Sequence, residues 1–90
     1  MTLQQLKYAI TVAQTGTITE AAEKLYISQP SLTNAIHELE KEMNIEIFTR
    51  TNKGIIVSKD GEDFLGYARQ VLEQAEVLVN ISIFISFSSS

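Results

Sequence analysis

The chain has 90 residues, which fits a single domain or one domain with an appendage. It has no cysteine, so disulfides and thiolate metal sites are excluded, and no apolar run approaches the roughly 20 residues that span a bilayer. The formal net charge of −4 excludes a generally basic nucleic-acid-binding chain, although it leaves room for a local basic patch.

The first 25 residues predict two short helices with a tight corner between them. Thr2 and Gln5 have the spacing of a capping box, and an apolar stripe at helical period follows them. Gly16 suits a left-handed residue that ends the first helix. A second capping box, Thr17 with Glu20, then opens the second helix.

A third helix is predicted after a turn at Tyr26. Ser28 is placed to cap it, and Pro30 falls in its first turn, where a missing amide hydrogen costs little. Asn44 suits the left-handed position that closes the helix. Four apolar residues fall on one arc and are expected in the core, namely Leu32, Ile36, Leu39 and Met43. The opposite face is polar.

The apolar period then changes from helical to strand-like. Residues 45–48 and 55–57 are β-prone, and a polar, basic segment at 49–54 separates them. Asn52 and Gly54 can both accept a positive φ, so this pattern predicts a β-hairpin with a basic tip.

The last long helix is expected over residues 59–80, with Ser58 as its cap. Its apolar residues form two adjacent rows, one with alternating spacings of four and three and one repeating every seven. Two such rows present more apolar surface than a small domain covers, so we expect this helix to pair with a second copy of itself. The residues of the expected pairing surface are Phe64, Leu65, Ala68, Val71, Leu72, Ala75, Leu78 and Val79.

Residues 81–90 differ in character, because isoleucine and phenylalanine alternate mostly with serine in a strand-like pattern. We expect a tail of uncertain origin here: a truncation end, an artificial extension or a frayed linker.

The two helices around the turn at 26–27 indicate a helix-turn-helix, whose second helix can enter a DNA major groove. The candidate DNA-binding residues of the third helix are Ser28, Gln29, Pro30, Ser31, Thr33, Asn34 and His37. Amide side chains can bond adenine bidentately, and hydroxyls reach a phosphate or a base edge. A solvated polar face is the alternative interpretation of the same pattern.

At the hairpin, Arg50, Asn52 and Lys53 are the candidates for sugar–phosphate or minor-groove contact, with a solvated turn as the alternative. The expected role of Glu38 and Glu40 is solubility or pairing with nearby cations. Most of the net negative charge lies beyond residue 54, outside these candidate regions.

Catalysis is not indicated. His37 is the single histidine, the carboxylates are scattered, and neither a nucleophile–base pair nor a phosphate-binding glycine loop is present. We therefore expect a protein that is not an enzyme, with no catalytic residue, no metal site and no cofactor.

The runs AAEKL at residues 21–25 and SQPSLT at 28–33 resemble the N-terminal domain of LysR-type transcriptional regulators. The resemblance covers residues 1 to about 79 and is extended by Ile36, Leu39, Glu40, Ile47, Phe48, Arg50 and Gly61. Many relatives place Arg or another long polar residue at Asn34 and Ala35, a basic residue at His37 and glycine at Asn44. The recognition surface is therefore unusually uncharged.

The resemblance implies a mainly α fold: a winged helix-turn-helix over residues 1–58, with three helices and a two-stranded wing, then a dimerising linker helix over 59–80. It implies a cytoplasmic homodimer, without membrane contact, on an interrupted palindrome in double-stranded promoter DNA. We expect the family's inducer-binding domain to be absent from this chain, so that an inducer would act only on a longer parent protein. The alternative function is an interaction module that pairs with full-length regulators and antagonises them.

Overall fold

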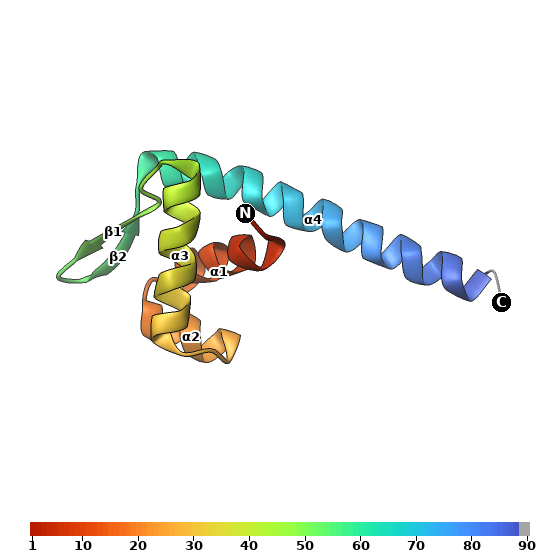
Figure 1. Ribbon diagram of the computed structural model, residues 1–90, viewed down its shortest axis with the longest axis horizontal. Helices are drawn as coiled ribbons and strands as arrows, with labels where there is room; N and C mark the ends of the chain where they lie inside the picture. The colour runs from red at the N-terminus through yellow and green to blue at the C-terminus, as the bar shows by residue number, and fades with distance from the viewer. Residues whose placement is uncertain (89–90) are drawn as a thin grey trace.

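The computed structural model describes residues 1–88, with the backbone alone at 84, 87 and 88. In chain order the elements are α1 (Leu3–Thr15), α2 (Ile18–Leu25), α3 (Gln29–Met43), β1 (Phe48–Thr51), β2 (Gly54–Val57) and α4 (Lys59–Ser88). The helices α1, α2 and α3 form a body, the β1–β2 hairpin projects from one side, and α4 runs far out on the other (Figure 1). The predicted winged helix-turn-helix with a long last helix is confirmed.

The predicted capping residues set the helix boundaries. The Gln5 amide donates to Thr2 Oγ1 at 3.1 Å, and the Thr2 amide donates to Gln5 Oε1 at 3.0 Å, which completes the first capping box. Gly16 ends α1 with a φ of 80° and donates to the Val12 carbonyl. At α2 the Glu20 amide donates to Thr17 Oγ1, but the described residues show no reciprocal bond from the Glu20 side chain, so only half of the second box forms.

Two residues other than glycine adopt a left-handed conformation. Asn44 closes α3 at φ 56°, as predicted. Tyr26 closes α2 at φ 59°, and its side chain is 94% exposed. A bulky residue in this region costs about 1–2 kcal/mol, and the Tyr26 side chain gains almost no burial in return. The turn between α2 and α3 is therefore a strained point of the fold.

The core lies where α1, α3 and the start of α4 meet. Its largest fully buried side chains are Leu6, Val12, Leu32, Leu39, Ile47 and Leu65. The predicted apolar arc of α3 faces this core, with three of its members buried and Met43 half-buried. The described residues leave no buried side-chain polar atom without a hydrogen-bond partner.

The hairpin is antiparallel, with Phe48 opposite Val57 and Thr51 opposite Gly54, so residues 52–53 form its loop. Gly54 has a φ of 127°, whereas Asn52 is not among the residues with positive φ, so only one of the two predicted positions needs that conformation. The Ile55 amide donates to the Gly16 carbonyl at 3.1 Å. This bond fixes the wing against the corner between α1 and α2.

Ser58 holds the start of α4 against the segment before the wing. Its hydroxyl accepts from the Gly61 amide at 2.9 Å and donates to the Glu46 carbonyl, while its own amide donates to the Ile47 carbonyl at 2.9 Å. A Cβ on Gly61 would lie 2.3 Å from the Ile47 carbonyl oxygen. Only glycine therefore permits this approach without a shift.

The last helix extends past its expected end at residue 80, because α4 continues without a break from Lys59 to Ser88 despite the strand-like pattern of residues 81–88. Extending an existing helix costs far less than nucleating one, so α4 propagates through residues of weak helix propensity. Residues 89–90 of the expected tail lie outside the described part of the chain. Among the described residues, no helix combines the length and apolarity that crossing a membrane requires.

Candidate nucleic-acid interface

The outer face of α3 presents polar side chains along its length. Gln29, Ser31, Asn34 and His37 are exposed, and Thr33 is half-buried on the side nearer the wing. These residues have no apolar role in the core, because the inner arc of α3 provides it. The structure therefore leaves the predicted face open to a partner.

The start of α3 is fixed by two serines. The Ser31 amide donates to Ser28 Oγ at 3.2 Å, and the Ser28 hydroxyl donates to Ser31 Oγ at 2.8 Å. Ser28 is thus occupied as a cap, whereas the Ser31 hydroxyl hydrogen remains available to a ligand. Because Pro30 has no amide hydrogen, the exposed first turn offers mainly side-chain groups for recognition.

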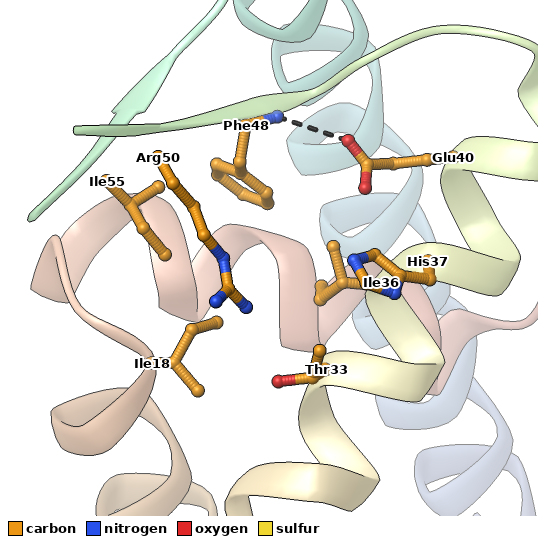
Figure 2. A pocket seen from close by; sticks show the side chains of 8 residues that line it. All are labelled: Ile18, Thr33, Ile36, His37, Glu40, Phe48, Arg50 and Ile55. Atoms are coloured by element: carbon orange, nitrogen blue, oxygen red, sulfur yellow. Dashed lines mark hydrogen bonds between the residues drawn. The ribbon is translucent and has the colours of Figure 1, made fainter.

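A cleft separates α3 from the wing, and side chains from both line it (Figure 2). Thr33 and His37 come from α3, and Arg50 comes from β1. Figure 2 shows the Arg50 side chain directed across the cleft, with its guanidinium near Ile18 and Thr33. The floor is apolar and is formed by Ile18, Ile36, Phe48 and Ile55.

Arg50 is a free cation in this cleft. Its side chain is exposed, and among the described residues its guanidinium has neither an ion pair nor a hydrogen bond. The described residues contain one ion pair, which joins the Met1 amino group to Glu42 at 2.5 Å. The positive charge of Arg50 is therefore left for a ligand.

Glu40 lines the same cleft, and its role differs from the predicted one. One carboxylate oxygen, Oε2, accepts from the Ile47 amide at 2.7 Å and from the Phe48 amide at 3.3 Å (Figure 2 draws the second bond). The prediction of solubility or cation pairing is therefore wrong for Glu40: it ties α3 to the start of the wing. Its partners lie seven and eight residues further on, so no short-range pattern signals the bond.

The wing tip carries the remaining candidates. Asn52 and Lys53 form the exposed two-residue loop of the hairpin. Thr51 stiffens this loop, because its hydroxyl donates to the Gly54 carbonyl at 2.8 Å and accepts from the Lys53 amide at 3.3 Å. The tip is thus a short, polar projection that can enter a narrow groove.

Part of the predicted pairing surface on α4 is buried within the protomer, and part of it is exposed. Leu65 and Ala68 are buried in the protomer core, and Phe64 and Leu72 pack partly against it. Val71, Leu78 and Val79 are exposed, and Ala75 is half-buried. The sequence interpretation omitted the exposed side chains of Tyr67, Ile81 and Ile85. The described residues contain no cluster of metal-ligating side chains.

Comparison with known proteins identifies this arrangement. Residues 3–62 match the family model of the bacterial regulatory helix-turn-helix proteins of the lysR family. The chain belongs to the LysR family. The sequence resemblance is thus confirmed, and this LysR-family chain is the winged helix-turn-helix, DNA-binding domain of a transcriptional regulator.

Two regulators show the extent of the similarity. ClcR of Pseudomonas putida is 40% identical over 77 residues, which are 86% of this chain and 26% of ClcR. YofA of Bacillus subtilis is 42% identical over 80 residues, which are 86% of this chain and 28% of YofA. The LysR-family chain thus spans about a quarter of the length of these relatives.

Solved structures of DNA complexes have the same fold. The CbnR DNA-binding domain with DNA has a TM-score of 0.90 at 35% identity, covering 96% of this chain and 99% of that one. The BenM DNA-binding domain with catB site 1 DNA has a TM-score of 0.91 at 31% identity, covering 96% and 97%. Because residues 1–58 alone are about two thirds of the chain, a coverage of 96% means that the structural agreement includes α4 as well.

Proposed function

We propose that the chain binds an interrupted palindrome in bacterial promoter DNA as a homodimer, in the cytoplasm. Each protomer places α3 in a major groove and the wing tip over the adjacent minor groove. The observation that carries this proposal is the exposed polar face of α3 beside a cleft that Arg50 lines, where the Arg50 guanidinium has no partner within the described part of the chain. The crystal structures of the CbnR and BenM domains in complex with DNA support DNA binding by a domain of this fold.

The proposed base contacts come from the first turns of α3. Gln29 and Asn34 can bond an adenine edge through two atoms, and the Ser31 hydroxyl and Thr33 can donate to a base or a phosphate. At the tip, Asn52 and Lys53 approach the minor groove. Because few of these groups are charged, we expect affinity to depend on hydrogen bonding and on dimerisation more than on charge.

Pairing of two copies is proposed through the exposed face of α4. Val71, Leu78 and Ile85 are seven residues apart, so they lie in one row along the helix, and all three are exposed. Tyr67, one turn before Val71, extends the row and is 71% exposed. A second copy would bury this row, since an exposed apolar strip of this length is rare on a monomer.

The experiment is selection from a pool of random duplex DNA at a series of salt concentrations, followed by sequencing of the retained molecules. We expect two half-sites related by a two-fold axis, with centres a whole number of helical turns apart, about 34–36 Å each. The affinity should fall with salt with a slope near −0.9 for each phosphate neutralised.

Two variants separate the surfaces. Thr33→Val with Arg50→Ala should abolish selection while the dimer persists, and Leu78→Gln should weaken the dimer while the protomer stays folded. Selection by the double variant that equals wild type would contradict the assigned DNA surface. A folded, dimeric wild-type protein that enriches no sequence would favour the alternative function, an interaction module that pairs with full-length regulators and blocks them.

An inducer-binding domain is not part of the matched region, and we propose that any small-molecule inducer acts only in a longer parent protein. The exposed surface of the described residues offers shallow apolar grooves along α4 instead.

A further inference from the structure

We propose that Glu40 is a positioning residue for DNA binding, because its bonds to the Ile47 and Phe48 amides set the place of the wing relative to α3. Base contacts by α3 and minor-groove contacts by the wing tip are then held in one register before the DNA arrives. This inference rests on the proposed docking of α3 and the wing tip. It requires no contact between Glu40 and DNA.

The wing has few fixed points on the rest of the domain. The hairpin projects from the body (Figure 1), and a cleft separates it from α3. Two backbone bonds hold its base: the Ile55 amide donates to the Gly16 carbonyl at 3.1 Å, and the Ser58 amide donates to the Ile47 carbonyl at 2.9 Å. Neither bond involves α3. In the described part of the chain, the hydrogen bonds that join α3 to the wing are the two that Glu40 accepts.

The link from Glu40 is short and sheltered. Figure 2 shows its carboxylate directed from α3 toward β1, where Oε2 accepts from the Ile47 amide at 2.7 Å and from the Phe48 amide at 3.3 Å. Bonds to an ionised acceptor are stronger than neutral ones, and the buried side chains of Ile36 and Phe48 lie beside this one and limit the access of water. Solvent therefore competes poorly for the bond, and the wing has a defined position in the free protein.

The place of the link at the base of the wing makes the tip sensitive to it. From Ile47 to Asn52 the extended chain covers about 17 Å, at about 3.4 Å per residue. A rotation of about 10° at the base would move the tip by about 3 Å, which is half the roughly 6 Å width of a minor groove. Release of Glu40 would thus leave α3 in its groove while the tip lost its register.

The consequence is a coupling between Glu40 and the contacts of the tip. A wing that is already in place contacts DNA without losing conformational freedom, whereas a released wing must be ordered as it binds. Lys53 at the tip should therefore contribute fully to affinity only while Glu40 holds the base. A role of Glu40 in stability alone predicts no such dependence, because every folded variant would then use Lys53 equally well.

The test is a double-mutant cycle on the selected operator duplex. Lys53→Ala should weaken binding of the otherwise wild-type protein by about fivefold or more, the value of about one hydrogen-bonded contact. In the Glu40→Asp background, whose carboxylate is one methylene shorter and cannot reach both amides, the same substitution should cost less than about twofold. Affinities are measured at a temperature where circular dichroism shows each variant to be folded.

Two further backgrounds separate the acceptor from the charge. Glu40→Gln keeps a carbonyl oxygen at the same reach, so it should preserve the full cost of Lys53→Ala. Glu38→Ala removes an exposed carboxylate from the same helix and should preserve that cost as well. Hydrogen exchange on the wild-type protein needs no variant: the Ile47 and Phe48 amides should be protected in the free protein as strongly as in the DNA complex.

An equal cost of Lys53→Ala in the wild-type and Glu40→Asp backgrounds would overturn the inference, and so would protection of the Ile47 and Phe48 amides that develops only on DNA. A Lys53→Ala variant that binds as well as wild type would overturn it too, because the tip would then make no contact that needs positioning. Each of these results leaves sequence selection by the wild-type protein, and with it the proposed function, standing. A wild-type protein that selects no duplex would remove the proposed function and this inference together.

Discussion

Gly61→Ala tests how closely α4 approaches the segment that leads into the wing. The added Cβ would lie 2.3 Å from the Ile47 carbonyl oxygen and 2.9 Å from Ile47 Cα. Ordinary contact begins near 3.4 Å, so the first turn of α4 must retreat by about 1 Å. That retreat would also stretch the 2.9 Å bond from the Ser58 amide to the Ile47 carbonyl.

The expected loss can be estimated from these contacts. Overpacking of a close contact costs about 1–3 kcal/mol, and loss of one hydrogen bond costs about 1 kcal/mol. Alanine recovers up to about 1 kcal/mol through its higher helix propensity. The net loss of about 1–3 kcal/mol is a large share of the roughly 5 kcal/mol at the low end of domain stabilities.

The matched control is Gly66→Ala on the same helix. A Cβ there meets no atom within 4 Å, so the substitution should raise stability by about 0.5–1 kcal/mol. Both variants and wild type are unfolded in urea at one fixed protein concentration, because dimerisation would make stability depend on concentration. A Gly61→Ala variant that is as stable as Gly66→Ala would refute the close approach.

Three further predictions concern single side chains. Glu40→Ala should lower the free energy of unfolding in urea by about 1–3 kcal/mol, because it leaves two backbone amides without their acceptor. Tyr26→Asn should raise the thermal midpoint by a few degrees, since asparagine tolerates the left-handed conformation and the lost ring is 94% exposed. Leu78→Gln should weaken the dimer at least tenfold in sedimentation equilibrium. Dimerisation would bury one Leu78 side chain in each copy, and full burial of a leucine side chain contributes about 1.5–3 kcal/mol.

Each of these three predictions has a control substitution. Glu38→Ala removes an exposed carboxylate from the same helix and should change stability by less than about 0.5 kcal/mol. Tyr26→Phe keeps the strain and should leave the midpoint unchanged; equal midpoints for Tyr26→Asn and Tyr26→Phe would argue against strain. Glu73→Gln lies on another face of α4, and if it weakened the dimer as much as Leu78→Gln does, the proposed row would be wrong.

The sequence predicted those features that depend on neighbouring residues. The capping of α1 by Thr2 and of α3 by Ser28, and the left-handed Gly16 and Asn44, each depend on a few adjacent positions, and all four are present. The α3 face could be predicted as well, because a helix separates apolar and polar residues at a fixed period. Local rules therefore placed the recognition helix correctly.

Features that depend on tertiary contacts were missed. The bonds from Glu40 to the Ile47 and Phe48 amides join positions seven and eight residues apart, for which no spacing rule exists. Leu65 and Ala68 have the same heptad-like spacing as the exposed residues of α4, and only packing against the body reveals that they are core. The helical state of residues 81–88 follows from the preceding helix rather than from their own alternating pattern.

The length of α4 has a consequence for how the chain folds. The helix is about 45 Å long at 1.5 Å per residue, and all of its described side chains from Glu76 onward are exposed. A helical segment without tertiary contacts is marginal in water. We therefore expect the outer half of α4 to become ordered only as two copies associate, so that mean helicity rises with protein concentration while the winged domain stays folded throughout.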